Sequence, residues 1–265
     1  MTALPYWHVD AFADRPFTGN QAAVMPLGKW LADETLQAIA EENNFAETAF
    51  LVKDTTGETD WGLRWFTPTT EIRLCGHATL ASGHVLLERD GGERVTFRTR
   101  KAGNLEVVRS EAGYELALPC IPTSPEPWPE AVALLGTQPK EVWQNDGRYG
   151  VYLFASEAEV RALDPDLRGL GALGDDQFIC TAPGERTDIV SRVFVPGGGV
   201  DEDSVTGSAH AVLTPFWATK LGRDSFTAHQ ASRRGGDLTL RLDGDRAWLG
   251  GGCVTVVEGT FHLPD

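Results

Sequence analysis

Residues 74–86 read LCGHATLASGHVL, thirteen positions without a formal charge in a chain where 23% of the residues are charged. A helix that begins at Gly76 would carry apolar or small residues on nearly every face, up to the first acid at Glu88. A helix without a polar face belongs in the interior of a protein. The segment therefore predicts a buried central helix, and one flat sheet cannot cover such a helix on all sides.

A second segment of this kind occurs in the other half of the chain. An F-x-P triplet precedes each segment, and the second segment reads TGSAHAVLTPFWAT, uncharged until Lys220. Beyond the segments, residues 103–120 align without a gap onto residues 236–253, at an offset of 133. Gly76 and Gly207, which open the two segments, differ by 131. These matches predict an α+β chain of two pseudo-symmetric domains, each a β-barrel-like sheet around a central buried helix.

The clearest boundary lies at residues 119–129, PCIPTSPEPWP, which contain five prolines. This spacing forbids a helix or a central strand and favours an extended connector. A chain of 265 residues is long enough for two ordinary domains. We therefore expect an N-terminal domain over residues 1–119 and a C-terminal domain over residues 130–265, with the return of the last strand to the first domain as a variant.

Local patterns place the remaining elements. Amphipathic patterns predict helices at residues 33–43, with Asp33 as the N-cap, and at residues 156–163. Gly222 supplies a stop for the second uncharged helix, whereas Pro215 inside it predicts a kink. Short runs of alternating or clustered apolar residues predict β-strands. These runs are residues 5–12, 47–53, 62–66, 94–100, 104–109, 114–118, 141–145, 149–155, 176–182, 188–195, 237–242 and 253–259.

Composition excludes several classes of function. A formal charge of −15 argues against general affinity for nucleic acid or for anionic membranes. No stretch approaches 18 consecutive apolar residues, and the N-terminus lacks the pattern of a signal peptide. The four cysteines show no CxxC spacing, which fits reduced thiols and a cytoplasmic location. The histidines lack ligand spacing and no glycine-rich nucleotide motif is present, so neither a metal nor a cofactor is predicted.

The starts of the two uncharged helices suggest a binding function. The first turn of a helix has unpaired backbone N–H groups and a partial positive charge. Gly76 and Gly207 would allow an anion to approach that backbone closely. If the two starts face each other across a cleft between the domains, they form a site for a small carboxylate. The alternative is that each glycine only allows the chain to turn.

Three ionisable residues near these starts are candidates for chemistry. His77 follows the helix-opening glycine, a placement that lowers the pKa of an imidazole and keeps it neutral. Asp203 lies four residues before Gly207, and its alternative role is an acidic loop or an N-cap. Glu47 opens an otherwise apolar strand, and most glutamates in such a place are solvated strand ends.

Four blocks of the sequence resemble the PhzF-like family, which is named for a phenazine-biosynthesis isomerase. They are VDAFADRPFTGNQAAV, NNFAETAFL, RWFTPTTEIRLCGHATLA and DEDSVTGSAHAVLTPFWATKLG, and the resemblance covers most of the chain in order. The family is similar in fold to diaminopimelate epimerase, with two homologous domains around central helices and a site in the cleft between them. This implied fold agrees with the duplication inferred from the residues alone.

The resemblance also implies site residues and a reaction. Glu47 would move a proton between two ring carbons of a dihydro-hydroxyanthranilate without a metal or organic cofactor, because one carboxylate can return the proton that it removes. His77 and Asp203 would orient the amino and carboxylate groups of the substrate. The carboxylate itself would bind at the two helix starts. In chain order, the implied set is Glu47, Gly76, His77, Asp203, Gly207 and Ser208.

One position departs from the epimerases that share this fold. Those enzymes use two thiols on opposite faces of the substrate carbon, whereas this chain has Cys75 and, in the second repeat, Thr206. Two-thiol epimerisation is therefore disfavoured, and an isomerase acting on a small carboxylate is the preferred function. A one-thiol epimerase that uses Cys75 and a non-catalytic binding protein for small acids are the alternatives. A homodimer is compatible with the resemblance.

Overall fold

The computed structural model describes residues 2–264, and the chain divides into two compact units. Unit 1 comprises Met1–Leu118 together with Gly250–Asp265, and unit 2 comprises Pro119–Leu249. Residues 250–265 thus belong with the N-terminal part of the chain. No helix within residues 2–264 combines the length and the apolar character needed to cross a membrane.

Unit 1 is a sheet of mixed direction with two helices. The helices are α1 (Asp33–Asn43) and α2 (Gly76–Asp90). The strands are β1 (Thr2–Ala11), β2 (Asn20–Leu27), β3 (Glu47–Lys53), β4 (Trp61–Phe66), β5 (Glu71–Ile72), β6 (Arg94–Thr99), β7 (Asn104–Ser110), β8 (Gly113–Pro119) and β18 (Cys253–Leu263). They pair in the order β18–β1–β2–β3–β4–β6–β7–β8, with β5 also on β4. Pairs β2–β3 and β4–β6 are parallel, and helices α1 and α2 supply the crossovers that parallel pairing requires.

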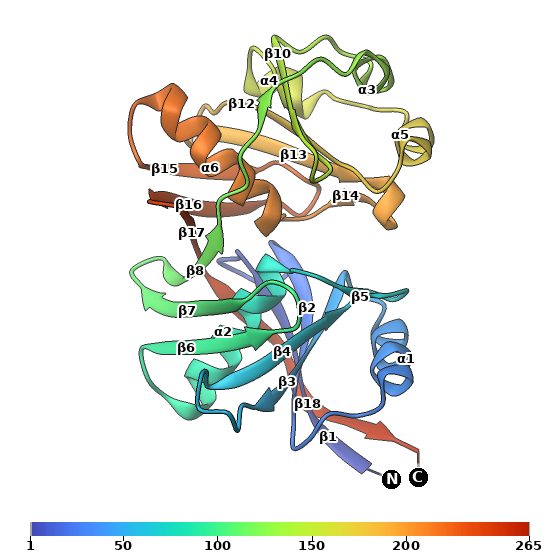
Figure 1. Cartoon of the computed structure of the whole chain (residues 1–265), viewed down its shortest axis with the longest axis vertical. Helices are drawn as coiled ribbons and strands as arrows, with labels where there is room; N and C mark the ends of the chain where they lie inside the picture. The colour runs from blue at the N-terminus through green and yellow to red at the C-terminus, as the bar shows by residue number, and fades with distance from the viewer. Residues whose placement is uncertain (1, 265) are drawn as a thin grey trace. The chain divides into compact units, whose positions relative to one another are not determined.

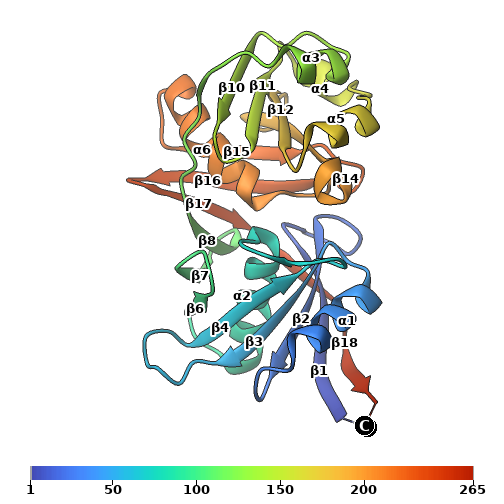
Figure 2. The ribbon, with the colours of Figure 1, turned by 45° about the vertical axis from the view of Figure 1, so that its right-hand side comes forward.

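Helix α2 is the central element of unit 1. It contacts strands β1, β2, β3, β6, β7 and β18, and Figures 1 and 2 show it enclosed by the strands of this unit. Its first eight residues, from Gly76 to Gly83, are all buried. The helix begins at Gly76, as the uncharged segment predicts, and it ends at Gly91. Burial on every face explains why the segment carries no formal charge before Glu88.

The small residues of α2 allow close packing, and Gly83 shows this most clearly. A Cβ atom added at Gly83 would lie 2.4 Å from Cγ1 of Val107 on β7. We expect Gly83→Ala to lower the free energy of unfolding by about 1–2 kcal/mol, because overpacking outweighs the gain in helix propensity. Urea unfolding measures this change.

A second variant tests the cause of the Gly83 effect. Val107→Gly removes Cγ1, Cβ and Cγ2, which a Cβ at Gly83 would approach to 2.4, 2.6 and 3.0 Å, so Gly83→Ala should be tolerated better in that background than in the wild-type chain. Equal losses in the two backgrounds would contradict packing against Val107 as the reason for glycine.

Unit 2 repeats the arrangement of unit 1. Its helices are α3 (Pro129–Leu135), α4 (Glu157–Arg161), α5 (Leu167–Leu173) and α6 (Gly207–Leu221), with a short 3-10 turn η1 (Pro196–Gly198). Its strands are β9 (Ser124–Pro125), β10 (Glu141–Asn145), β11 (Tyr149–Leu153), β12 (Gln177–Pro183), β13 (Ile189–Val195), β14 (Val200–Asp203), β15 (Ser225–Gln230), β16 (Gly236–Asp243) and β17 (Arg246–Gly251). Pairs β11–β12 and β13–β15 are parallel, as β2–β3 and β4–β6 are in unit 1. The predicted fold class of two pseudo-symmetric α+β units around buried helices is confirmed.

Helix α6 continues through Pro215, although the proline predicts a kink. Proline has no N–H to donate to the carbonyl of Ala211, four residues earlier. The backbone N–H of Ile121 donates to that carbonyl instead, at 3.3 Å. The helix runs unbroken from Gly207 to Leu221, and Gly222 ends it in a left-handed conformation with φ of 66°, as predicted. A segment of the Pro-rich connector thus satisfies the group that the proline leaves unpaired.

Helix α1 packs on the sheet of unit 1, and its start corrects a prediction. Leu36 and Ile39 of α1 join Met25 and Phe50 in a buried apolar cluster. The helix begins at Asp33, so Ala32 is the N-cap and no side chain caps the first turn. Asp33 forms an ion pair with Arg64 instead, which explains why its carboxylate does not fold back onto the helix. The prediction of Asp33 as the N-cap is wrong by one residue.

Candidate functional site

The predicted residues of unit 1 meet at the start of α2. Glu47 is the first residue of β3, which pairs in parallel with β2. Its Oε2 lies 2.9 Å from Nε2 of His77, the second residue of α2. The Cys75 side chain, at the N-cap, completes the group, with Sγ 3.6 Å from Nδ1 and 4.0 Å from Nε2 of His77. The turn of chain into α2 therefore places a thiol, an imidazole and a carboxylate together.

Asn20 is a further member of this site, and the sequence did not predict a role for it. Its Nδ2 lies 3.1 Å from Nδ1 of His77, and both side chains are buried. Asn20 opens β2 directly after Gly19, which has φ of 65°. A Cβ at Gly19 would lie 2.2 Å from the carbonyl oxygen of Ala11, so only glycine fits there. The stretch FTGNQ contains a signal for Asn20, because a polar residue between a turn glycine and an apolar strand indicates a specific contact for its side chain.

The environment of His77 corrects the predicted effect of the helix start. Burial disfavours the charged imidazolium, but hydrogen bonding to the Cys75 sulfur and the negative charge of the Glu47 carboxylate favour it more, so the pKa of His77 is raised well above its ordinary value. The prediction of a lowered pKa is therefore wrong, because neighbouring negative charge outweighs the helix dipole. His77 at neutral pH is an imidazolium paired with a carboxylate.

Cys75 has the opposite character to an activated thiol. Burial, followed by the negative charge of Glu47, raises the pKa of Cys75 to about 11. The thiol therefore stays protonated near neutral pH, despite its place at a helix start and beside His77. Free thiols are found at all four cysteines, which agrees with the reduced state expected from the sequence.

The Glu47 carboxylate keeps one oxygen available. Its Oε2 is buried and accepts no hydrogen bond of good geometry from the described residues, so its approach to His77 is an ion pair rather than an aligned hydrogen bond. Oxygen, nitrogen and sulfur atoms of Glu47, His77 and Cys75 lie within 4.8 Å of one another, the arrangement of a potential metal-binding group. The arrangement can thus accept a proton or a cation.

The predicted residues of unit 2 gather at the start of α6. Oδ2 of Asp203, the last residue of β14, accepts a hydrogen bond of 2.6 Å from Oγ1 of Thr206. Oε1 of the buried Gln230 accepts from the Thr206 backbone N–H at 2.8 Å, and its Nε2 donates to the carbonyl of Asp203 at 2.7 Å. Ser208 exchanges hydrogen bonds with Gln177. Sequence reasoning missed both glutamines, because a single Gln at a strand end carries no motif.

At equivalent positions of the two helices, different side chains form a hydrogen bond to the backbone carbonyl of the N-cap residue. In unit 1 the hydroxyl of Thr79 donates to the carbonyl of Cys75. In unit 2 the repeat partner of Thr79 is His210, whose Nδ1 lies 2.8 Å from the carbonyl of Thr206. Burial lowers the pKa of His210 to about 4, so this imidazole is neutral and donates through Nδ1. Each unit thus ties the carbonyl of its N-cap residue with a side chain one turn into the helix.

The structure brings the predicted residues together in two groups. Glu47, Gly76 and His77 lie at the start of α2, and Asp203, Gly207 and Ser208 lie at the start of α6. Neither N-cap side chain forms a capping hydrogen bond, so neither supplies an acceptor to the first-turn N–H groups. That the two groups share one site stays a prediction.

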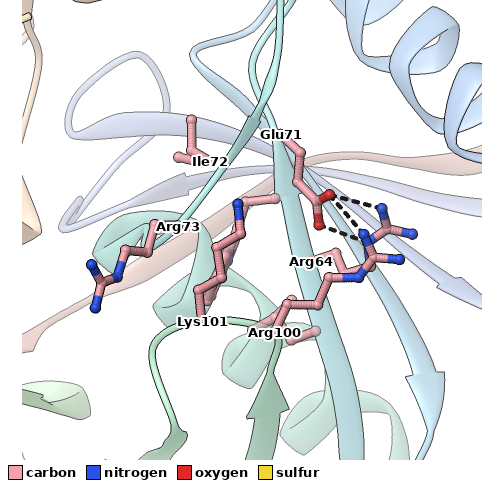
Figure 3. A pocket seen from close by; sticks show the side chains of 8 residues that line it. Arg64, Glu71, Ile72, Arg73, Arg100 and Lys101 are labelled. Carbon is pink, nitrogen blue, oxygen red and sulfur yellow. Dashed lines mark hydrogen bonds and ion pairs between the residues drawn. The ribbon is translucent and has the colours of Figure 1, made fainter.

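A shallow pocket in unit 1 is lined by several basic residues, but these residues have a structural explanation (Figure 3). Arg64, whose side chain is 3% exposed, donates from Nε and Nη2 to both oxygens of Glu71. Its Nη1 donates to Asp33 at 2.9 Å, and Arg100 adds a second cation to Glu71. The guanidinium thus ties β4 to β5 and to α1.

Removing Arg64 is expected to destabilise unit 1. Arg64→Ala leaves Glu71 partly buried without its bidentate partner, so the free energy of unfolding should fall by about 2 kcal/mol. Chemical denaturation measures the loss, and Arg94→Ala, an exposed arginine on β6, serves as the control. Equal stability of the Arg64 and Arg94 variants would contradict a structural role for the guanidinium.

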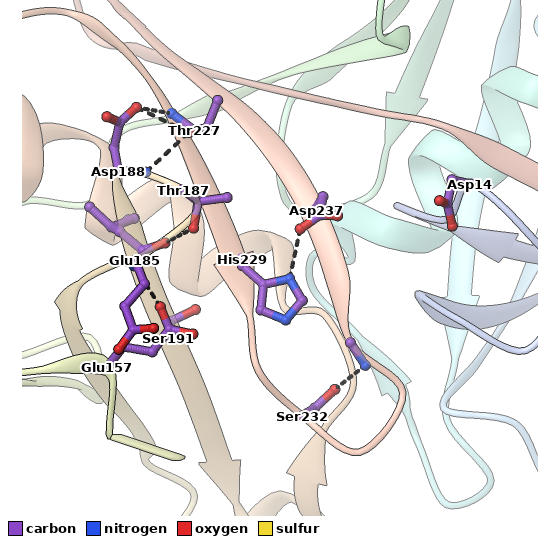
Figure 4. Close-up of polar contacts among 12 residues, drawn as sticks. Asp14, Glu157, Glu185, Thr187, Asp188, Ser191, Thr227, His229, Ser232 and Asp237 are labelled. Atoms are coloured by element: carbon purple, nitrogen blue, oxygen red, sulfur yellow. Dashed lines mark hydrogen bonds and ion pairs between the residues drawn. The ribbon is translucent and has the colours of Figure 1, made fainter. Parts of the chain in front are cut away.

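A second polar cluster, in unit 2, also fastens strands (Figure 4). Oδ2 of Asp188 accepts from the backbone N–H and the hydroxyl of Thr227, at 2.8 and 3.0 Å. Nδ1 of His229 lies 2.6 Å from Oδ1 of Asp237 on the neighbouring strand. These contacts hold β15 to the start of β13 and to β16. The cluster is therefore explained by strand pairing.

Comparisons with known proteins identify relatives over the whole chain. A sequence model of the family described as phenazine biosynthesis-like protein (PhzC-PhzF) matches residues 9–259. An uncharacterized isomerase of Pseudomonas aeruginosa is 46% identical over 98% of this chain and 99% of its own length. The crystal structure of a PhzF-family phenazine biosynthesis protein from Enterococcus faecalis matches with a TM-score of 0.92 at 41% identity, over 99% of this chain and 100% of that one.

A more distant likeness concerns the fold alone. A hydroxyproline epimerase from Agrobacterium vitis, solved with bound trans-4-hydroxy-L-proline, has a TM-score of 0.58 at 12% identity. The match covers 99% of this chain and 93% of the epimerase. The expected likeness in fold to epimerases is consistent with this result.

Proposed function

The chain is an isomerase of the phenazine biosynthesis-like family, and on that premise we propose that it moves a proton between two carbon atoms of a small carboxylate-bearing metabolite. The observation that carries this proposal is the pair of Glu47 and His77, with Oε2 and Nε2 2.9 Å apart. Within residues 2–264 that oxygen accepts no well-aligned hydrogen bond. The His77 side chain can hold the Glu47 carboxylate in position, and a positioned carboxylate can take a proton from carbon and return it.

The reaction needs one carboxylate and no further base. The Glu47 carboxylate takes a proton from a substrate carbon, the electrons of that C–H bond enter the π-system, and Glu47 returns the proton to a different carbon. No net proton is gained or lost, so Glu47 ends in the state in which it began. His77 stays protonated throughout and holds the carboxylate in place, and Asn20 holds the ring of His77.

The substrate carboxylate is assigned to the helix starts. The first-turn N–H groups at Gly76, and those at Gly207 and Ser208, are suited to an anion because of their direction and the helix dipole. Asp203 would bind an amino group of the substrate. Helix starts that bind a carboxylate and an aspartate that binds an amino group together favour an amino acid or an aminated cyclic acid as substrate over a plain fatty acid.

The test is solvent deuterium exchange. Incubation in D₂O with trans-2,3-dihydro-3-hydroxyanthranilate, and with cyclic amino acids such as trans-4-hydroxy-L-proline, should incorporate deuterium at carbon with at least one of them, as read by NMR. Hydroxyproline belongs in the panel because a protein of this fold was solved with it. Tight binding with neither deuterium incorporation nor an isomerised product in any compound would favour the alternative of a non-catalytic binding protein.

Cys75→Ala separates the isomerase from a one-thiol epimerase. The pKa of Cys75 is raised to about 11, which leaves little thiolate to act as a base near neutral pH. Exchange should therefore survive Cys75→Ala. Loss of exchange in this variant, with folding intact by circular dichroism, would assign the reaction to the thiol. A cytoplasmic location and a homodimer also remain part of this proposal.

A further inference from the structure

We infer that Glu47, His77 and Cys75 form a binding site for zinc, and that zinc and substrate exclude each other there. Carboxylate, imidazole and thiolate are three ligand types that zinc binds in proteins. The sequence alone gave no such expectation, because residues 47, 75 and 77 do not show the spacing of a zinc motif. Strand β3 and the start of α2 bring them together.

The distances between the donor atoms suit a tetrahedral ion. Ordinary zinc bond lengths place two tetrahedral ligands about 3.4–3.6 Å apart. Nε2 of His77 lies 4.0 Å from Sγ of Cys75 and 2.9 Å from Oε2 of Glu47. A shift of about half an ångström in each of these two separations, and a sulfur-to-carboxylate separation brought within bonding range from at most 4.8 Å, would admit the ion. Rotations of the glutamate and cysteine side chains can supply these shifts. Three protein ligands leave a fourth position for water.

The surroundings hold the ligands in place. Metal-bound histidines donate their other ring N–H to a fixed acceptor. Asn20 lies 3.1 Å from Nδ1 of His77, and its amide can present either its nitrogen or its oxygen to the ring. Oε2 of Glu47 is buried without a well-aligned donor, and a cation would satisfy it. The site is therefore assembled before the metal arrives.

Exclusion of substrate follows from the shared atoms. A zinc ion bound to Oε2 of Glu47 and Nε2 of His77 occupies the atoms that the proposed proton transfer uses. Binding releases the Cys75 thiol proton and the Nε2 proton of His77 to solvent. This inhibitory consequence rests on the proposed function, whereas the metal site itself does not.

Cobalt titration tests the site without any assay of catalysis. We expect Co²⁺ added to the reduced, metal-free protein to produce a thiolate-to-cobalt charge-transfer band and the d–d bands of a four-coordinate ion, and Zn²⁺ to abolish both. Cys75→Ser should remove the charge-transfer band, and Asn20→Ala should weaken binding by about 10–100-fold. Cys120→Ser, a half-buried cysteine of unit 2, is the matched control and should keep the band. Absence of the band in the wild-type protein, or its loss only in Cys120→Ser, would overturn the site.

The two proposals fail in different ways. A protein that binds cobalt through Cys75 but exchanges no deuterium would retain the metal site and lose the isomerase mechanism. A protein that exchanges deuterium, yields no cobalt band and is insensitive to Zn²⁺ would lose the metal site alone.

Discussion

Replacing Glu47 by glutamine should lower the rate of solvent exchange or isomerisation by about 10²–10⁴-fold, the usual worth of a positioned general acid–base group. Glutamine preserves the size of the side chain and its place at the start of β3, but its amide cannot take a proton from carbon. Substrate binding should change little, because the carboxylate of the substrate is assigned to the helix starts rather than to Glu47. The loss should therefore appear in kcat far more than in KM.

Two further measurements show whether Glu47 acts as proposed. The exposed Glu258 of β18 provides the control, and Glu258→Gln should leave the rate unchanged. In Glu47→Gln the pKa of His77 should fall from its raised value, because burial remains while the carboxylate is gone. Imidazole NMR shifts report that change. A Glu47→Gln variant that keeps full activity would exclude this residue as the proton carrier.

Acid should destabilise the chain through His210, by about 3 kcal/mol between pH 7 and pH 4. The folded-state pKa of His210 is about 4, whereas an unfolded histidine titrates near 6.5. Between these two pKa values, His210 is therefore protonated in the unfolded chain but not in the folded chain. Stability from this group is fully present above pH 6.5 and is lost as the pH falls toward 4. Urea unfolding at a series of pH values measures the slope.

A matched variant isolates the His210 contribution from that of the carboxylates. His210→Gln can still donate to the carbonyl of Thr206 but does not titrate, so its stability should fall less steeply between pH 6.5 and pH 4 than that of the wild type. His77→Gln serves as a contrast of opposite sign. The raised pKa of His77 gives stability that is present below pH 6.5 and lost as the pH rises through the folded value. Parallel pH profiles for wild type and His210→Gln would rule out the buried neutral imidazole.

The fold was accessible from the sequence because two strong signals agreed. An uncharged helix must be buried, and its recurrence at a nearly constant offset indicated a repeat. The offset of 133 between residues 103–120 and 236–253 corresponds in the structure to β7 and β8 against β16 and β17. Six strands were missed: β2, β5, β9, β14, β15 and β17. A proline near the end of β2 and scattered polar residues in β15 hide their alternation, and β5, β9 and β14 are only two to four residues long. Helix α3 was missed because its first residue is also the last proline of the connector.

The candidate site was only partly accessible, for electrostatic reasons. Sequence placed Glu47 and His77 in one site through the resemblance, but not the 2.9 Å contact that reverses the expected pKa shift of His77. The dipole of a helix start lowers the pKa of a histidine there in any fold, so sequence alone predicts that effect. A neighbouring carboxylate raises the pKa only when the fold brings the carboxylate close to the histidine. Gln230 was missed for the same reason, since its hydrogen bonds to Thr206 and Asp203 form only when the fold brings these residues together.

The pairing of β18 with β1 has a consequence for synthesis on the ribosome. Residues 2–11 pair with residues 253–263 as antiparallel neighbours, so a nascent chain has an open sheet edge until residues 253–263 have been translated. The sheet of unit 1 cannot be completed before unit 2 has been translated, although residues 2–118 leave the ribosomal exit tunnel first. A fragment that stops after residue 118 would lack this strand, and we expect it to aggregate or to recruit a strand from another chain.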